Sequence, residues 1–134
     1  MSARILVVED EEALTTLLRY NLDAEGYDVE TVGRGDDADT RLKERVPDLI
    51  VLDWMLPGLS GIELCRRLRA RPETRQLPII MLTARGEESE RVRGLATGAD
   101  DVTQLENLPA LVGWLERRKS SDGFGNLHAA GDRD

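Results

Sequence analysis

The sequence lacks the usual features of a secreted or membrane-inserted protein. Its 134 residues include a single cysteine, Cys65, so an internal disulfide is excluded and a disulfide-stapled scaffold is not indicated. No apolar run approaches the roughly 20 residues that a membrane span needs. The acids from Glu9 to Glu12 interrupt the first apolar run, as no signal peptide would. We therefore expect a cytoplasmic protein without membrane attachment.

Basic residues are outnumbered by acidic ones. Eighteen Lys and Arg stand against 26 Asp and Glu, which leaves a net charge of −8 at pH 7. A chain this acidic repels a phosphate backbone, so we expect no direct binding of nucleic acid. A divalent cation or a cationic partner surface is the better match. The hydrophobic content of 40% is enough for one domain with a real core.

Short apolar runs alternate along the chain with stretches of helical periodicity. The runs that predict strands are Ile5–Val8, Val29–Val32, Leu49–Leu52 and Pro78–Leu82, with Val102–Leu105 as a weaker fifth. Helices between successive parallel strands predict an α/β fold of the flavodoxin-like, doubly wound type, with sheet order 2-1-3-4-5. The alternating pattern of the second run predicts an edge strand.

The sequence predicts one domain over residues 1–119. Leu108, Leu111 and Leu115 mark its last helix. Residues 120–134 contain Gly, Ser, Asp and Ala with little apolar content, and we expect a flexible tail there. No segment of this chain resembles a DNA-binding domain.

Carboxylates follow two of the predicted strands. Glu9 and Asp10 follow the first strand, and Asp53 follows the third. These strands are neighbours in the predicted order, and ligands of open parallel sheets bind outside the carboxyl ends of strands. Three carboxylates in one small volume repel one another, and a hard cation such as Mg²⁺ relieves the repulsion. Glu9 and Asp10 could instead cap the following helix, whereas Asp53 directly follows four apolar strand residues and has no such role.

Two further features point to the same crevice. Thr83 ends the fourth strand, where its hydroxyl could donate to a phosphoryl oxygen or cap the next helix. Pro57 and Gly58 form a tight turn soon after Asp53, and this turn could direct a backbone carbonyl at a metal ion.

These motifs resemble the receiver domain of two-component response regulators, and specifically the OmpR/PhoB subfamily. The resemblance covers about residues 3–101. It is carried by the segments Ile5–Glu11, Asp48–Gly58, Met81–Gly86, Arg93–Leu95 and Gly98–Asp101.

The resemblance implies a role for each site residue. Asp53 would accept a phosphoryl group from the phosphohistidine of a sensor histidine kinase, and the output would be control of transcription. Glu9, Asp10 and Asp53 would hold Mg²⁺ together with the backbone carbonyl of Met55. Thr83 would bond a phosphoryl oxygen and pass the signal to the next helix. Such a domain catalyses only its own phosphorylation and dephosphorylation, so it is not otherwise an enzyme.

The chain departs from the family after Asp101. Family members carry an aromatic residue in the fifth strand and, near its end, a lysine that contacts the phosphoryl group. This chain has no lysine from residue 44 to residue 118 and no aromatic residue between Trp54 and Trp114. Phosphorylation should therefore remain possible, while its coupling to a conformational switch should be impaired.

Two alignments of the altered strand are open. Without a gap, Val102 takes the place of the aromatic residue and Leu105 that of the lysine. With one residue deleted after Asp101, Gln104 takes the place of the lysine, and Pro109 falls where the last helix begins. We prefer the second alignment for that reason.

The resemblance also implies a homodimer through the fourth helix, the fifth strand and the fifth helix, held by ion pairs. Arg91, Asp100 and Asp101 retain one side of these pairs. Ala110 and Trp114 stand where an acid and a base are expected, so the pairs would be broken. Trp114 would either make a different contact on an exposed face or anchor the last helix in the core.

Three other functions compete with this interpretation. A folded but silent receiver or interaction scaffold is compatible with the altered fifth strand. A Mg²⁺-dependent aspartyl-phosphate phosphatase of the haloacid-dehalogenase type would need an acid where Met55 stands. A flavin-binding electron carrier would need a phosphate loop rich in Ser, Thr and Gly in place of Glu9 to Glu12.

Overall fold

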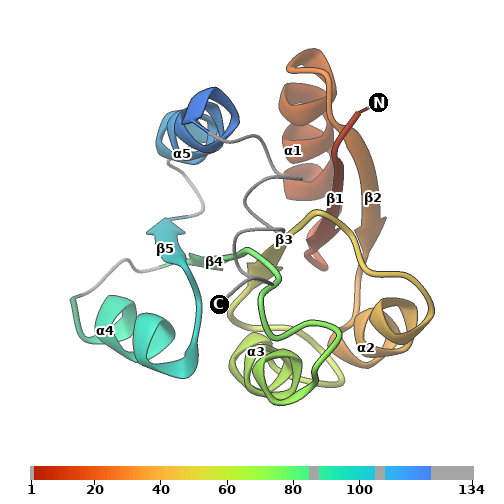
Figure 1. Ribbon diagram of the computed structural model, residues 1–134, viewed down its shortest axis with the longest axis vertical. Helices are drawn as coiled ribbons and strands as arrows, with labels where there is room; N and C mark the ends of the chain where they lie inside the picture. The colour runs from red at the N-terminus through yellow and green to blue at the C-terminus, as the bar shows by residue number, and fades with distance from the viewer. Residues whose placement is uncertain (1, 85–87, 105–107, 122–134) are drawn as a thin grey trace.

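Five parallel strands alternate with five helices in the part of the chain that the structure, a computed structural model, describes (residues 2–84, 88–104 and 108–121; Figure 1). The strands are β1 (Arg4–Val8), β2 (Asp28–Val32), β3 (Leu49–Asp53), β4 (Ile79–Thr83) and β5 (Asp101–Gln104). The helices are α1 (Glu12–Ala24), α2 (Gly35–Glu44), α3 (Gly61–Ala70), α4 (Glu88–Thr97) and α5 (Leu108–Ser121).

The strands form one sheet in the order β2-β1-β3-β4-β5, and every neighbouring pair is parallel. The predicted doubly wound topology and the edge position of β2 are both confirmed. β5 begins at Asp101, one residue earlier than expected, and Leu105 lies outside the described residues. Among the described residues, no helix combines the length and the apolar character that crossing a membrane requires.

Helices cover both faces of the sheet, with α1 and α5 on one side and α2, α3 and α4 on the other (Figure 1). Successive strand residues point to opposite faces, so a separate hydrophobic core lies on each side of the sheet. Ile5 and Val7 belong to the core beneath α1 and α5, and Leu6 and Val8 to the core on the other face. β3 is buried on both faces along its whole length, as its solid apolar run predicts. Its last residue, Asp53, is therefore carried to the sheet edge by a rigid, buried strand.

Trp114 lies in the core rather than on an exposed face. Its side chain is 6% exposed and belongs to the core cluster that contains Leu111 and Leu115. Of the two alternatives left open for Trp114, the exposed contact is wrong, because residues three and four apart share the helix stripe that faces the sheet. The alternative, a buried anchor of the last helix, is confirmed.

The end of the domain differs slightly from the sequence prediction. α5 continues through Ser121, beyond the predicted boundary at residue 119. The greater part of the predicted tail, residues 122–134, lies outside the described residues. The flexibility of the tail therefore stays a prediction.

Candidate functional site

The structure brings together the three carboxylates that the sequence pattern selected. Asp53 ends β3, and Glu9 and Asp10 directly follow β1, the neighbouring strand. One oxygen of each carboxylate lies within 4.8 Å of one oxygen of each of the others. Glu9 and Asp53 are buried, with 3% and 7% of their surface exposed, whereas Asp10 is exposed. The cluster, called the acid pocket below, thus combines two buried carboxylates with one that is exposed to solvent.

Backbone contacts hold Glu9 in this position. Its amide donates to the carbonyl of Val32 at 3.0 Å, and its Oε2 accepts the amide of Glu11 at 2.9 Å. This bond reaches Glu11, the residue before α1, and the capping role of Glu9 stays an alternative. Its other oxygen, Oε1, is buried without a hydrogen-bond partner among the described residues. An orphaned buried carboxylate oxygen beside two further carboxylates suits a cation, which would supply the missing partner.

Asp53 is fixed by the turn that follows it. The amide of Trp54 donates to the carbonyl of Leu82 at 2.8 Å, which ties the turn to β4. The amide of Met55 donates to Oδ1 of Asp53 at 3.3 Å. The amide of Gly61, the first residue of α3, donates to the carbonyl of Trp54 at 3.0 Å. The turn after Asp53 is thereby held by β4 and α3, and the carboxylate itself by the amide of Met55.

Burial and mutual repulsion raise the pKa values of the two buried acids. Burial raises the pKa of Glu9 to about 8, and the charge of Asp53 contributes to this rise. Burial also raises the pKa of Asp53, with a contribution from the charge of Asp10. Without a cation, near pH 7, the pocket therefore retains a proton that free carboxyl groups would release. Hard oxygen ligands with room for water are the donor set that suits Mg²⁺.

The raised pKa of Glu9 predicts a pH-dependent stability. The folded protein retains a proton that the unfolded chain has already lost above its ordinary value of 4.5, so stability falls as pH rises from 4.5 to about 8. Replacing Glu9 with Gln removes this effect. We expect the variant, without divalent cations, to be more stable than the parent at about pH 8.5 by about 1 kcal/mol or more, or ~2–4 °C in melting temperature.

The measurement is thermal unfolding at about pH 6 and about pH 8.5, with EDTA or with Mg²⁺. Mg²⁺ should stabilise the parent and have little effect on the Glu9→Gln variant. Glu12→Gln, which removes an exposed acid at the start of α1, is the control. Equal pH dependence in the parent and in Glu9→Gln would contradict the account of this pocket.

Thr83 is buried at the end of β4, as expected, and its hydroxyl is directed at α4. Its Oγ1 donates to Oε1 of Glu90 at 2.8 Å, and 3% of Thr83 is exposed. This partner is a side chain in the first turn of α4, and whether the hydroxyl also caps the helix stays a prediction. No signal in the sequence marks Glu90, because periodicity does not reveal which polar side chains meet across a loop.

The packing of β5 against α4 is close. The register pairs Val102 with Met81 and Gln104 with Thr83. Val102 is buried beneath Gly94, where an added Cβ would lie 2.6 Å from Cγ2 of Val102. Gln104 is exposed. Which residue replaces the family's lysine stays a prediction, since Leu105 lies outside the described residues.

The charges expected at a dimer interface also have contacts within the chain. Arg91 donates to the carbonyl of Val102 at 3.1 Å and lies 3.7 Å from Oδ1 of Asp101. Asp100 pairs with Arg69 at 3.1 Å and accepts the amide of Ile79 at 2.8 Å. Asp100 is thus committed to joining β4 to the start of β5, and the interface role of these residues stays a prediction.

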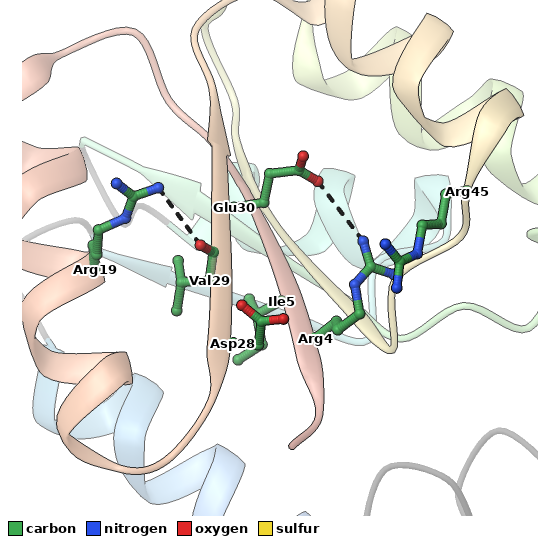
Figure 2. Close-up of a pocket in the computed structure, with 7 residues that line it drawn as sticks. All are labelled: Arg4, Ile5, Arg19, Asp28, Val29, Glu30 and Arg45. Carbon is green, nitrogen blue, oxygen red and sulfur yellow. Dashed lines mark hydrogen bonds and ion pairs between the residues drawn. The ribbon is translucent and has the colours of Figure 1, made fainter. Parts of the chain in front are cut away.

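A hollow of about 290 Å³ lies at the opposite end of β1 and β2 (Figure 2). It is lined by Arg4, Ile5, Arg19, Asp28, Val29, Glu30 and Arg45. In Figure 2, Arg4 is directed at Glu30, with the charged atoms 3.8 Å apart, and Arg19 at the carbonyl of Val29, 3.5 Å away. Basic and acidic side chains alternate here, so we assign no ligand to this hollow.

Comparison with known proteins gives consistent results. Residues 5–104 match the family model of the response regulator receiver domain. The chain is 63% identical over 136 aligned residues to the phosphate regulon transcriptional regulatory protein PhoB of Rhizobium meliloti (strain 1021), covering 98% of this chain and 60% of that protein. It is 50% identical over 101 residues to PhoB of Escherichia coli (strain K12), covering 75% of this chain and 44% of that protein. The chain thus spans 60% or less of these two relatives.

Solved structures show the same fold. The receiver domain of sensor histidine kinase PA1611 from Pseudomonas aeruginosa PAO1, which has a magnesium ion coordinated in its active site cleft, matches with a TM-score of 0.80 and 30% identity, covering 93% of this chain and 99% of that one. The BeF3-activated receiver domain of RstA from Klebsiella pneumoniae matches with a TM-score of 0.77 and 35% identity, covering 85% and 95%. The chain therefore belongs to the response regulator receiver domain family, of the PhoB type.

Proposed function

We propose that this chain accepts a phosphoryl group on Asp53 from the phosphohistidine of a sensor histidine kinase, in a reaction that requires Mg²⁺. The observation that carries the proposal is the cluster of Glu9, Asp10 and Asp53 at the carboxyl ends of β1 and β3, with its orphaned Glu9 oxygen. The family match and the magnesium-containing neighbour support it. The control of transcription that the relatives' names describe is the proposed output of the longer protein.

The residues of the pocket have distinct parts in this chemistry. The carboxylates of Glu9, Asp10 and Asp53 and the carbonyl of Met55 would hold the cation. When bound, Mg²⁺ neutralises charge on the transferring phosphoryl group. Met55 holds Oδ1 of Asp53 with its amide, which leaves Oδ2 to attack phosphorus. A P–O bond to Asp53 forms as the P–N bond breaks, and the leaving imidazole keeps the electron pair of that bond.

Coupling to an output is proposed to be weak. The chain has no lysine between residues 44 and 118, so Thr83 would stabilise the phosphoryl group without the charge-assisted bond that the family's lysine makes. The same observation favours the second candidate, a receiver that folds and does not signal. The two differ in whether phosphorylation changes the protection of α4 amides from hydrogen exchange.

The decisive test of phosphoacceptance is the intact mass of the protein after incubation with Mg²⁺ and acetyl phosphate. We expect a gain of one phosphoryl group, about 80 Da, that is lost in Asp53→Asn and in EDTA. No gain under conditions that label another receiver domain would contradict the proposal.

A further inference from the structure

The hydroxyl of Thr83 already has an acceptor in this structure. Thr83 stands one residue beyond Leu82, the register partner of Asp53, and is therefore at the edge of the acid pocket. Its Oγ1 donates to Oε1 of Glu90, 2.8 Å away, and Glu90 is half-buried in the first turn of α4. This bond joins the strand that borders the phosphoacceptor to the helix on the other side of the loop.

A hydroxyl carries one proton and donates it to one strong acceptor at a time. A phosphoryl group on Asp53 would offer three acceptor oxygens, but the carboxylate of Glu90 is itself a charged acceptor and makes a strong bond. The two acceptors therefore compete for the same proton. The competition has more weight in this chain because no lysine between residues 44 and 118 is available to contact the phosphoryl group.

We propose that Glu90 is a positioning residue, which holds the Thr83 hydroxyl towards α4 in the unphosphorylated protein and so opposes occupation of the phosphoryl position. The inference rests on the proposed function, since it assigns a competitor to the phosphoryl group on Asp53.

The same bond fastens the first turn of α4. Arg91, the next residue, attaches this turn to β5 through the carbonyl of Val102 at 3.1 Å. Glu90 attaches it to β4 through Thr83. When the Thr83 hydroxyl donates to a phosphoryl oxygen instead, the second attachment is lost and the first remains. Glu90 is thus the residue through which α4 senses the state of the pocket.

The test uses beryllofluoride with Mg²⁺ as a phosphoryl mimic, titrated against the full chain and followed by tryptophan fluorescence, since Trp54 adjoins Asp53. Glu90→Ala should bind beryllofluoride about tenfold more tightly than the parent, because Thr83 no longer has to give up a hydrogen bond to a charged acceptor. Glu88→Ala is the matched control, because Glu88 is an exposed acid in the same helical turn. It should bind as the parent does.

A purely structural effect of Glu90 is separated by repeating the substitution in a Thr83→Ala background. There, Glu90→Ala should change the affinity no further. An unchanged or weakened affinity in Glu90→Ala, or a tightening that persists without the Thr83 hydroxyl, overturns the inference. Should Glu90→Ala fail to fold, Glu90→Gln takes its place and should show a smaller tightening. Absence of binding by the parent itself would instead contradict the proposed function, and the inference with it.

Discussion

Replacement of Gly61 by alanine is expected to destabilise the fold by about 3 kcal/mol or more and to abolish phosphorylation of Asp53. An added Cβ at Gly61 would lie 2.0 Å from the carbonyl oxygen of Asp53, 2.9 Å from its carbonyl carbon and 3.1 Å from Cα of Trp54. These are backbone atoms of the phosphoacceptor and its neighbour, and no side-chain rotation relieves the overlap. Either α3 or the end of β3 has to move.

Gly33→Ala is the matched control for this substitution. Gly33 also adjoins the acid pocket, but an added Cβ would lie 4.0 Å from the nearest atoms, which belong to Glu9 and Asp10. The control should fold and accept a phosphoryl group as the parent does. Thermal unfolding and intact mass after acetyl phosphate are the two measurements. A Gly61→Ala protein with parental stability and labelling would show that the end of β3 is not held as described.

Replacement of Arg69 by alanine is expected to cost about 3 kcal/mol of stability, because its guanidinium donates hydrogen bonds to several acceptors. The side chain is 20% exposed and forms an ion pair with Asp100 at 3.1 Å. It donates to the backbone carbonyls of Thr74, Arg75, Leu77 and Gly98 at distances from 2.6 to 3.3 Å. The guanidinium therefore joins the end of α3 to the turns before β4 and β5. Removing it leaves several of these carbonyls without a partner.

Arg66→Ala on the same helix provides the comparison. Arg66 is largely exposed and pairs with Glu63 at 2.6 Å, so its loss should cost less than about 1 kcal/mol. Arg69→Lys should recover little of the stability, since an ammonium group cannot reach acceptors spread across a planar fork. Urea unfolding measures all three variants. Equal urea midpoints for Arg69→Ala and Arg66→Ala would contradict the proposed stabilising role of Arg69.

The sequence was sufficient to predict the sheet and the acid cluster. Alternation of apolar runs with helical spacing determines a parallel sheet, and the position of an acid directly after a buried run determines which end of the sheet it occupies. Glu9, Asp10 and Asp53 could therefore be brought together without coordinates. The same logic placed Thr83 at the neighbouring strand end.

The sequence pattern could not predict contacts between side chains across loops. The hydrogen bond from Thr83 to Glu90 and the several hydrogen bonds of Arg69 depend on the direction of long polar side chains. The hydrophobic periodicity of a sequence carries no information about that direction. Trp114 shows a related limit. The sequence left Trp114 either on an exposed face or in the core, and its burial beside Leu111 and Leu115 in the folded chain decides for the core.

The carboxylate of Asp53, and not that of Glu9 or Asp10, is proposed to carry the phosphoryl group. Borohydride reduction converts an acyl phosphate of aspartate into homoserine, and peptide mass spectrometry then locates the converted residue. After treatment with acetyl phosphate and Mg²⁺, we expect homoserine at position 53 alone, and none when EDTA replaces Mg²⁺. Conversion at Glu9 or Asp10, or conversion that does not depend on Mg²⁺, would contradict the account.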